Sequence, residues 1–202
     1  MWQLLSKHWK LVVLWGIIIG LVSLGVSLFF PKQYSAASSV LIISRDRAGI
    51  DPYTQAKSAE RIGQNLAQVM KTTDFYNKVM ENAADVDQSA WKNLSDREQR
   101  KKWQKDVRAE MIFGGSLLRV TAYGKSYDDA LALAKSVTQT VTSRGWEYVG
   151  GDVALKTVDS PLVSRWPARP NLGLNAAVGV LVGLLLASLW VVRYRRAIFG
   201  RW

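Results

Sequence analysis

The sequence predicts an α+β domain held between two transmembrane helices, and three observations lead to this fold class. Two long apolar segments without a charged residue lie near opposite ends of the chain, at residues 11–30 and 172–192. All 16 acidic residues lie between these two segments. In the same central stretch, residues 31–170, short β-rich segments alternate with longer segments whose apolar residues recur every three or four positions.

Each apolar segment is long enough to cross a lipid bilayer. At a rise of about 1.5 Å per residue, twenty residues form a helix roughly 30 Å long, which matches the hydrocarbon core. A buried helix of a soluble core is one alternative, but such helices are seldom apolar on every side over this length. A cleaved signal peptide is the alternative for residues 11–30, yet its apolar region would span only about 7–15 residues. We therefore expect two uncleaved spans.

The distribution of charge predicts the orientation of these spans. The chain has a net charge of +11, and its short ends, residues 1–10 and 193–202, contain basic residues and no acidic ones. Because basic flanks stay on the cytoplasmic side, both termini are expected in the cytoplasm. Residues 31–170 would then lie in the periplasm or outside the cell, anchored in the cell membrane. These flanks hold about half of the net charge, so a pI near 10.0 does not indicate a nucleic-acid partner here.

Residues that carry chemistry are scarce. The chain has no cysteine and one histidine, His8, which excludes disulfides, cysteine-ligated metals and sites built from several histidines. It contains no glycine-rich phosphate loop, serine nucleophile motif or zinc-protease motif. Asp128-Asp129 and Asp85-x-Asp87 are the closest acidic pairs, and helix capping and a polar turn explain them. We expect a protein that is not an enzyme and that holds no cofactor or metal.

The first half of the central domain predicts one strand followed by three helices. Residues 33–44 form the strand, with the following side chains on one face: Tyr34, Ala36, Ser38, Val40 and Ile42. Asp51-Pro52 begins the first helix, and Thr73 caps the second. The third begins with a capping box, Ser95-x-x-Glu98, and runs to Met111. Its charged body indicates either a solvated face or a basic surface for an anionic glycan or a neighbouring subunit.

The second half predicts a strand, a helix and a strand. Residues 117–123 alternate as a strand, and Ser126-x-x-Asp129 caps a helix that Gly150-Gly151 ends. The last strand is residues 153–158. Strands alternating with helices around one small sheet predict an α+β domain with a split βαβ arrangement.

A proline-marked linker, residues 160–171, leads into the second span. Its three prolines disfavour helix and stiffen the approach to the membrane. Small residues in the second span predict a face that admits close helix packing, with a Gly-x-x-x-Gly spacing, although small residues are also common in membrane helices without such a role. The residues expected to act in this linker and packing are Pro161, Pro167, Pro170, Gly173, Gly179 and Gly183.

The order of these segments resembles one known family. The first span ends in FFPKQYSAASSVLIIS, the central helices contain AERIGQNLAQVM and TDFYNKVM, and the strand–helix unit reads LLRVTAYGKSYDDALALAKSVTQTV. The segment VALKTVDSPLVSRWPARPN then leads into a glycine-rich span. This arrangement is similar to the polysaccharide co-polymerases, the Wzz-type chain-length determinants, over nearly the whole chain. The corresponding features are Pro31 and Tyr34, the segment 127–130, and the three linker prolines.

The resemblance implies a non-enzymatic, oligomeric protein of the inner membrane that regulates the chain length or export of a surface polysaccharide. Its implied partners are further copies of itself, the lipid bilayer, a polysaccharide polymerase and the growing glycan. An outer export component is also among them. The chain departs from the family in its short domain, where residues 95–111 would stand for a longer helical extension. It also lacks a fused kinase domain after the second span, so the expected relationship is to the short form.

Two other functions stay open from the sequence. One is a membrane adaptor that activates a separate cytoplasmic tyrosine kinase through the last segment, residues 193–202. The aromatic residues that would contact the kinase there are Tyr194, Phe199 and Trp202. The other is an unrelated two-span sensor or scaffold. Topogenic arginines and interfacial aromatics alone would also explain the last segment.

Overall fold

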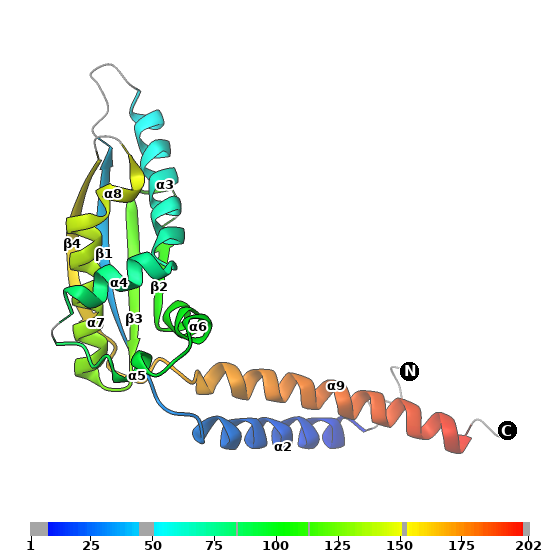
Figure 1. Ribbon diagram of the computed structural model, residues 1–202. Coiled ribbons are helices and arrows are strands. Elements are labelled where there is room, and N and C mark those ends of the chain that lie inside the picture. The colour runs from blue at the N-terminus through cyan, green and yellow to red at the C-terminus, as the bar shows by residue number, and fades with distance from the viewer. Residues whose placement is uncertain (1–7, 45–50, 84, 113, 151–152, 200–202) are drawn as a thin grey trace. The chain divides into compact units, whose positions relative to one another are not determined.

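The computed structural model describes residues 8–44, 51–83, 85–112, 114–150 and 153–199. The chain divides into two compact units, one made of Met1–Lys32 with Ala168–Trp202 and the other of Gln33–Pro167. The first unit contains two helices, and the second is a domain of strands and helices. Figure 1 labels the helices and strands of both units.

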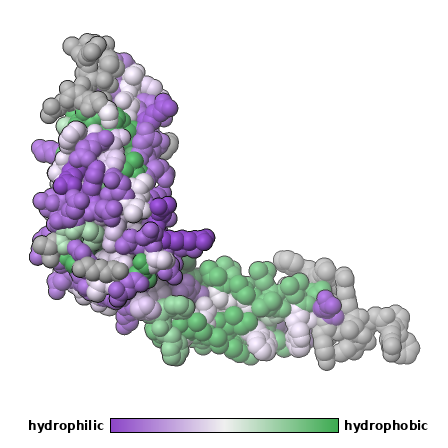
Figure 2. All heavy atoms as spheres, in the orientation of Figure 1, coloured by the Kyte–Doolittle hydropathy of each residue, from purple (hydrophilic) through white to green (hydrophobic). Residues whose placement is uncertain are grey.

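The first unit is a pair of helices, α2 (Trp9–Leu28) and α9 (Leu172–Phe199). Both are long and apolar enough to cross a membrane, by length and composition, over Trp9–Leu28 and Leu172–Arg193. These limits agree with the predicted spans to within two residues. Large apolar side chains cover most of the outer surface of the pair, and Figure 2 shows them as a hydrophobic coat.

The second unit is built on a four-stranded antiparallel sheet in the order β2-β3-β1-β4. The strands are β1 (Tyr34–Ser44), β2 (Val107–Met111), β3 (Leu117–Gly124) and β4 (Val153–Val163). Strands β3 and β4 both run antiparallel to β1, so they are parallel to each other. Helix α7 (Tyr127–Arg144) connects them, with β1 between them. The predicted split βαβ arrangement is therefore confirmed.

The remaining helices lie between β1 and β2 in the sequence, except the last. They are α3 (Pro52–Val69), α4 (Thr73–Glu81), α5 (Ser89–Lys92), α6 (Asp96–Asp106) and α8 (Trp146–Val149). The capping predictions hold because they depend on local chemistry alone. The Asp51 carboxylate accepts a hydrogen bond from the Thr54 amide at 3.3 Å, and both predicted capping boxes form, at the starts of α6 and α7. At α4, however, Thr72 and not Thr73 is the cap.

One face of the sheet forms the core together with the helices. Alternate residues of β1 are buried as predicted, including Ala36, Val40 and Ile42. The buried hydroxyls of Ser38 and Thr138 share a hydrogen bond of 2.6 Å that joins β1 to α7. Four apolar residues of α7, spaced three or four positions apart, are fully buried: Ala130, Ala134, Val137 and Val141.

Three predicted boundaries were wrong. Residues 107–111 form strand β2, paired with β3, because Val107 and Met111 fit the period of a strand as well as that of a helix. Helix α7 ends at Arg144, ahead of the short α8, rather than at Gly150.

The third wrong boundary is the beginning of the linker, because β4 extends to Val163 and contains Pro161. The β1–β4 register shifts between Ala37 and Ser39, opposite the segment 159–162. Proline has no amide hydrogen to donate, so it is tolerated at such an irregularity on an edge strand.

Candidate functional site

The contact between α2 and α9 is a seam of small residues. A Cβ atom added at Gly183 would lie 2.9 Å from the Gly16 Cα and 3.0 Å from the Trp15 carbonyl oxygen. A Cβ atom at Gly179 would lie 2.6 Å from the Ser23 Cβ and 3.1 Å from the Gly20 Cα. A side chain at position 183 would collide with the backbone of α2. A Cβ atom at Gly16 or Gly20 would instead meet the side chains of Leu184 and Val180. The close approach of the two backbones therefore depends most on glycine in α9.

A group of polar residues continues the seam towards the end of α2 and the beginning of α9. The Asn175 side-chain amide donates to the Ser27 hydroxyl at 2.8 Å, and the Ser23 hydroxyl donates to the Asn175 carbonyl oxygen at 2.9 Å. The Ser27 hydroxyl in turn donates to the Ser23 carbonyl oxygen at 2.9 Å. Two of these three bonds cross between the helices, so the seam combines close packing with hydrogen bonds.

Only some of the predicted packing residues lie in the seam. Gly179 and Gly183 lie in the seam, but the nearest atom to a Cβ at Gly173 would be the Asn171 side-chain oxygen at 3.7 Å. Sequence analysis missed the matching residues of the first span, although Gly16-x-x-x-Gly20 has the same spacing as Gly179-x-x-x-Gly183.

The linker prolines and the C-terminal aromatics are more scattered. Pro161 lies in β4, while Pro167 and Pro170 follow that strand. Tyr194 and Phe199 fall within α9, where only their backbone is described. Trp202 lies outside the described residues. The structure therefore leaves the proposed kinase contact as a prediction.

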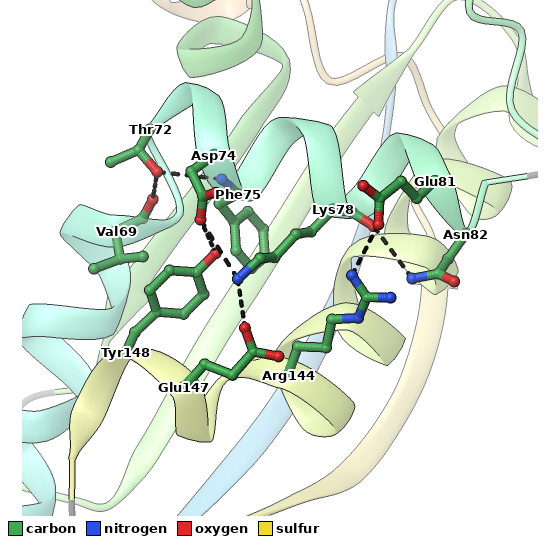
Figure 3. A network of polar contacts seen from close by, with 10 residues as sticks. All are labelled: Val69, Thr72, Asp74, Phe75, Lys78, Glu81, Asn82, Arg144, Glu147 and Tyr148. Atoms are coloured by element: carbon green, nitrogen blue, oxygen red, sulfur yellow. Dashed lines mark hydrogen bonds and ion pairs between the residues drawn. The ribbon is translucent and has the colours of Figure 1, made fainter.

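A network of polar contacts joins α4 to α7 and α8 (Figure 3). The Lys78 ammonium lies 2.5 Å from the Glu147 carboxylate and also contacts Asp74. The Tyr148 hydroxyl donates a hydrogen bond to the Asp74 carboxylate. Beside this group, Arg144 forms an ion pair of 2.9 Å with Glu81.

The pKa values in this network favour a fastening role over acid–base chemistry. The hydrogen bond from Tyr148 lowers the pKa of Asp74, and the Glu147 carboxylate raises the pKa of Lys78. Burial raises the pKa of Tyr148. All three groups thus keep their ordinary charge at neutral pH, whereas a general acid or base needs a pKa near the working pH. The network holds α4 against α8.

A small cavity of about 60 Å³, lined by both polar and apolar side chains, lies where β1 begins and β3 ends. The residues around it include Gln33, Gly124, Trp91, Lys102 and Asp106. Lys102 and the buried Asp106 form an ion pair of 2.7 Å, and the Lys102 ammonium lies 5.3 Å from the centre of the Trp91 ring. The buried Trp91 indole N–H meets no acceptor within the described residues. A cavity of this size and polarity suits ordered water.

The described ranges contain no group of three or more histidine, cysteine or acidic residues that could hold a metal ion. A comparison of the chain with the models of known protein families finds no match. A comparison with curated proteins also finds none.

Proposed function

We propose that this protein is a two-span protein of the cell membrane that regulates the chain length or export of a surface polysaccharide. It works as a non-enzymatic homo-oligomer, with both termini in the cytoplasm and the domain outside it. The domain would present its surface to the polymerase and to the growing glycan. The order of segments shared with the Wzz-type chain-length determinants supports the polysaccharide role.

One observation carries the membrane architecture. Ala36, near the beginning of β1, pairs with Val163, the last residue of β4, so the chain enters and leaves the domain at neighbouring points. An apolar helix ends shortly before the first point, at Leu28, and another begins shortly after the second, at Leu172. A domain inserted between two membrane spans needs this arrangement, because both of its ends must face the same bilayer.

The orientation is tested with single cysteines, since the chain has none of its own. A cysteine replacing the exposed Ser89 in intact spheroplasts should react with a membrane-impermeant maleimide, and one replacing Ser6 should not react. Labelling of the second position alone would reverse the proposed topology. Labelling of both positions in intact cells would contradict two spans.

The polysaccharide role is tested by deleting the gene and comparing the ladder of surface glycans on a gel. We expect the distribution of chain lengths to change and the chain supplied in trans to restore it. An unaltered ladder would contradict the proposal. An unaltered ladder combined with reduced tyrosine phosphorylation of a cytoplasmic kinase would favour the adaptor function. Purified protein should show no ATPase or kinase turnover, and turnover abolished by one substitution in this chain would contradict the non-enzymatic assignment.

A further inference from the structure

One end of the domain carries exposed apolar and basic side chains. This basal end is where β1 begins and where β3 and β4 end, as the pairs Tyr34–Gly124 and Ala36–Val163 show. The last residues of β4 and the segments that follow β3 and β4 contain the residues of what we call the basal surface: Lys125, Tyr127, Leu162, Arg165 and Trp166. Leu162 is 76% exposed and Trp166 is 77% exposed. Tyr127 is also more than half exposed, at 52%.

Hydrogen bonds hold this surface in place. The Ser164 amide donates to the Ser35 carbonyl oxygen at 2.7 Å, and the Ser164 hydroxyl accepts from the Ser35 amide at 3.2 Å. The same hydroxyl contacts the carbonyl oxygen of Trp166 at 2.9 Å. The backbone that carries Trp166 is thus attached to the first residues of β1. The Trp166 side chain is therefore exposed on a backbone that hydrogen bonds hold in place, and not on a loose chain end.

The covalent chain limits how far this end can lie from the end of the first apolar helix. Five residues, 29–33, separate Leu28, the last residue of α2, from Tyr34, the first residue of β1, so the two are six residue steps apart. A fully extended chain of that length reaches about 20 Å at most. The headgroup layer extends about 5–8 Å beyond the hydrocarbon core on each side. If α2 spans the bilayer, the basal surface is therefore held close to the headgroups.

The residue types match that environment. Tryptophan and tyrosine are enriched where lipid meets water, because one part of each ring is apolar and another forms hydrogen bonds. Lysine and arginine at the same level attract anionic phosphates. Scattered single apolar residues are common on soluble surfaces. In this domain, the large apolar residues Leu162 and Trp166 occur together with Lys125 and Arg165 at the end that the chain connects to the apolar helices.

We propose that the basal surface docks onto the headgroup layer of an anionic membrane, with Leu162 and Trp166 at the acyl boundary and with Lys125 and Arg165 against phosphate groups. The domain is thereby held at a set height and rotation above the bilayer. This inference rests on the part of the proposed function that puts α2 and α9 in the membrane. It does not depend on the polysaccharide role.

The experiment uses the full chain with one cysteine at a time, labelled with the fluorophore NBD. The chain is reconstituted in vesicles of phosphatidylcholine and phosphatidylglycerol. These contain a doxyl lipid whose quencher lies near the headgroup for positions 162 and 53, and at the middle of the acyl chain for position 181. Leu162→Cys reports on the basal surface. Tyr53→Cys is the matched control, because Tyr53 is 74% exposed and lies at the start of α3, at the opposite end of the sheet in Figure 1. Leu181→Cys, on the outer side of α9, reports separately on insertion of the span.

We expect the doxyl lipid to quench most of the emission from positions 162 and 181 and little from position 53. Quenching at 181 without quenching at 162 overturns the docking and leaves the two-span proposal standing. An NBD probe at 162 with blue-shifted emission that the lipid does not quench indicates cover by a second protein copy, which also overturns it. Lack of quenching at 181 instead contradicts the membrane part of the proposed function.

A second variant tests the contact with phosphate. Lys125→Glu combined with Arg165→Glu reverses two exposed charges and should leave the domain folded, as circular dichroism can verify. We expect this variant to lose most of the quenching at position 162 in anionic vesicles, and added salt to produce a similar loss in the parent chain. Quenching that neither charge reversal nor salt reduces would contradict the role of the two cations.

Discussion

The two units of this chain use large and small residues in opposite ways. In the domain, bulky apolar side chains such as Phe75 and Trp103 form a buried core, and the basal surface is an exception to this pattern. In the helix pair, bulky side chains such as Leu181 face outward, and glycine lies at the contact. Water drives large apolar groups together, whereas lipid does not, so helices in lipid associate through close backbone packing and hydrogen bonds. The comparison supports different surroundings for the two units.

The largest expected effect tests this difference by the same kind of truncation in both units. Phe75→Ala removes a fully buried ring and should lower the free energy of unfolding of the domain by about 3–5 kcal/mol. Leu181→Ala removes a side chain that is 60% exposed and should change the free energy of unfolding by less than about 0.5 kcal/mol. Urea unfolding of each full-length variant in nanodiscs, followed by circular dichroism, measures both. Equal losses would refute the contrast between the units.

The next effect concerns the glycine seam. Gly183→Leu puts a side chain where even a Cβ atom would lie 2.9 Å from Gly16, so α2 and α9 should separate towards the roughly 8–10 Å spacing of helices with larger residues at their contact. Gly25→Leu is the control, because a Cβ there would have no atom within 4 Å.

The separation is measured between spin labels at two exposed positions, Leu14→Cys and Leu189→Cys, by pulsed electron paramagnetic resonance. We expect a longer distance for the seam variant only. If both variants gave the parent distance, the close glycine contact would not determine how the helices pair.

Some features of this structure could be predicted from the sequence, and others could not. The capping boxes at Ser95 and Ser126 were predictable, because a cap depends on residues three positions apart. The burial of alternate β1 residues was predictable for a similar reason, since the period of a strand is local. Strand β2 was not, because Val107 and Met111 satisfy the helical and the strand period equally, and only pairing with β3 decides between them.

The seam shows a different limit. Gly16-x-x-x-Gly20 was visible in the sequence, but the residues that face it lie more than 150 positions further along the chain. Spacing alone does not reveal which helix a small-residue face meets. The spacing of Gly179 and Gly183 therefore predicts a packing role but does not identify α2 of the same chain as their partner. Likewise, the network of Asp74, Lys78 and Tyr148 joins segments that only the tertiary structure brings together.

A smaller effect is expected from the hydrogen bonds of the seam. Asn175→Ala removes the bond of 2.8 Å to Ser27 and should weaken helix pairing by about 0.6–1.7 kcal/mol, the range measured for hydrogen bonds between membrane helices. Ser188→Ala is the control, since the Ser188 hydroxyl bonds to the Leu184 carbonyl oxygen within α9. Titration with sodium dodecyl sulfate, followed through the same spin-label distance, measures the difference. Equal resistance of the two variants would show that the bond between the helices contributes nothing.

The smallest effect is a pH dependence of the domain, caused by the network in Figure 3. The Tyr148 hydroxyl holds the pKa of Asp74 below its ordinary value of 3.8. A carboxyl group with a lowered pKa stabilises the fold fully above its unfolded pKa and loses this contribution as the pH falls through its folded pKa. Tyr148→Phe removes the donor. The variant should therefore be slightly less stable than the parent at pH 7, and the difference should shrink as the pH falls below about 4.

Thermal unfolding of the full chain between pH 2 and pH 7 measures this convergence. Tyr127→Phe is the matched control, because it removes the hydroxyl of an exposed tyrosine at the start of α7 and should leave the pH profile of the parent unchanged. The stabilities of the parent and the Tyr148→Phe variant should become more similar in acid. Protonated Asp74 carries no charge, so the hydrogen bond that it accepts from the Tyr148 hydroxyl is weaker. A constant difference at every pH would mean that the Tyr148 hydroxyl does not act through the charge of Asp74.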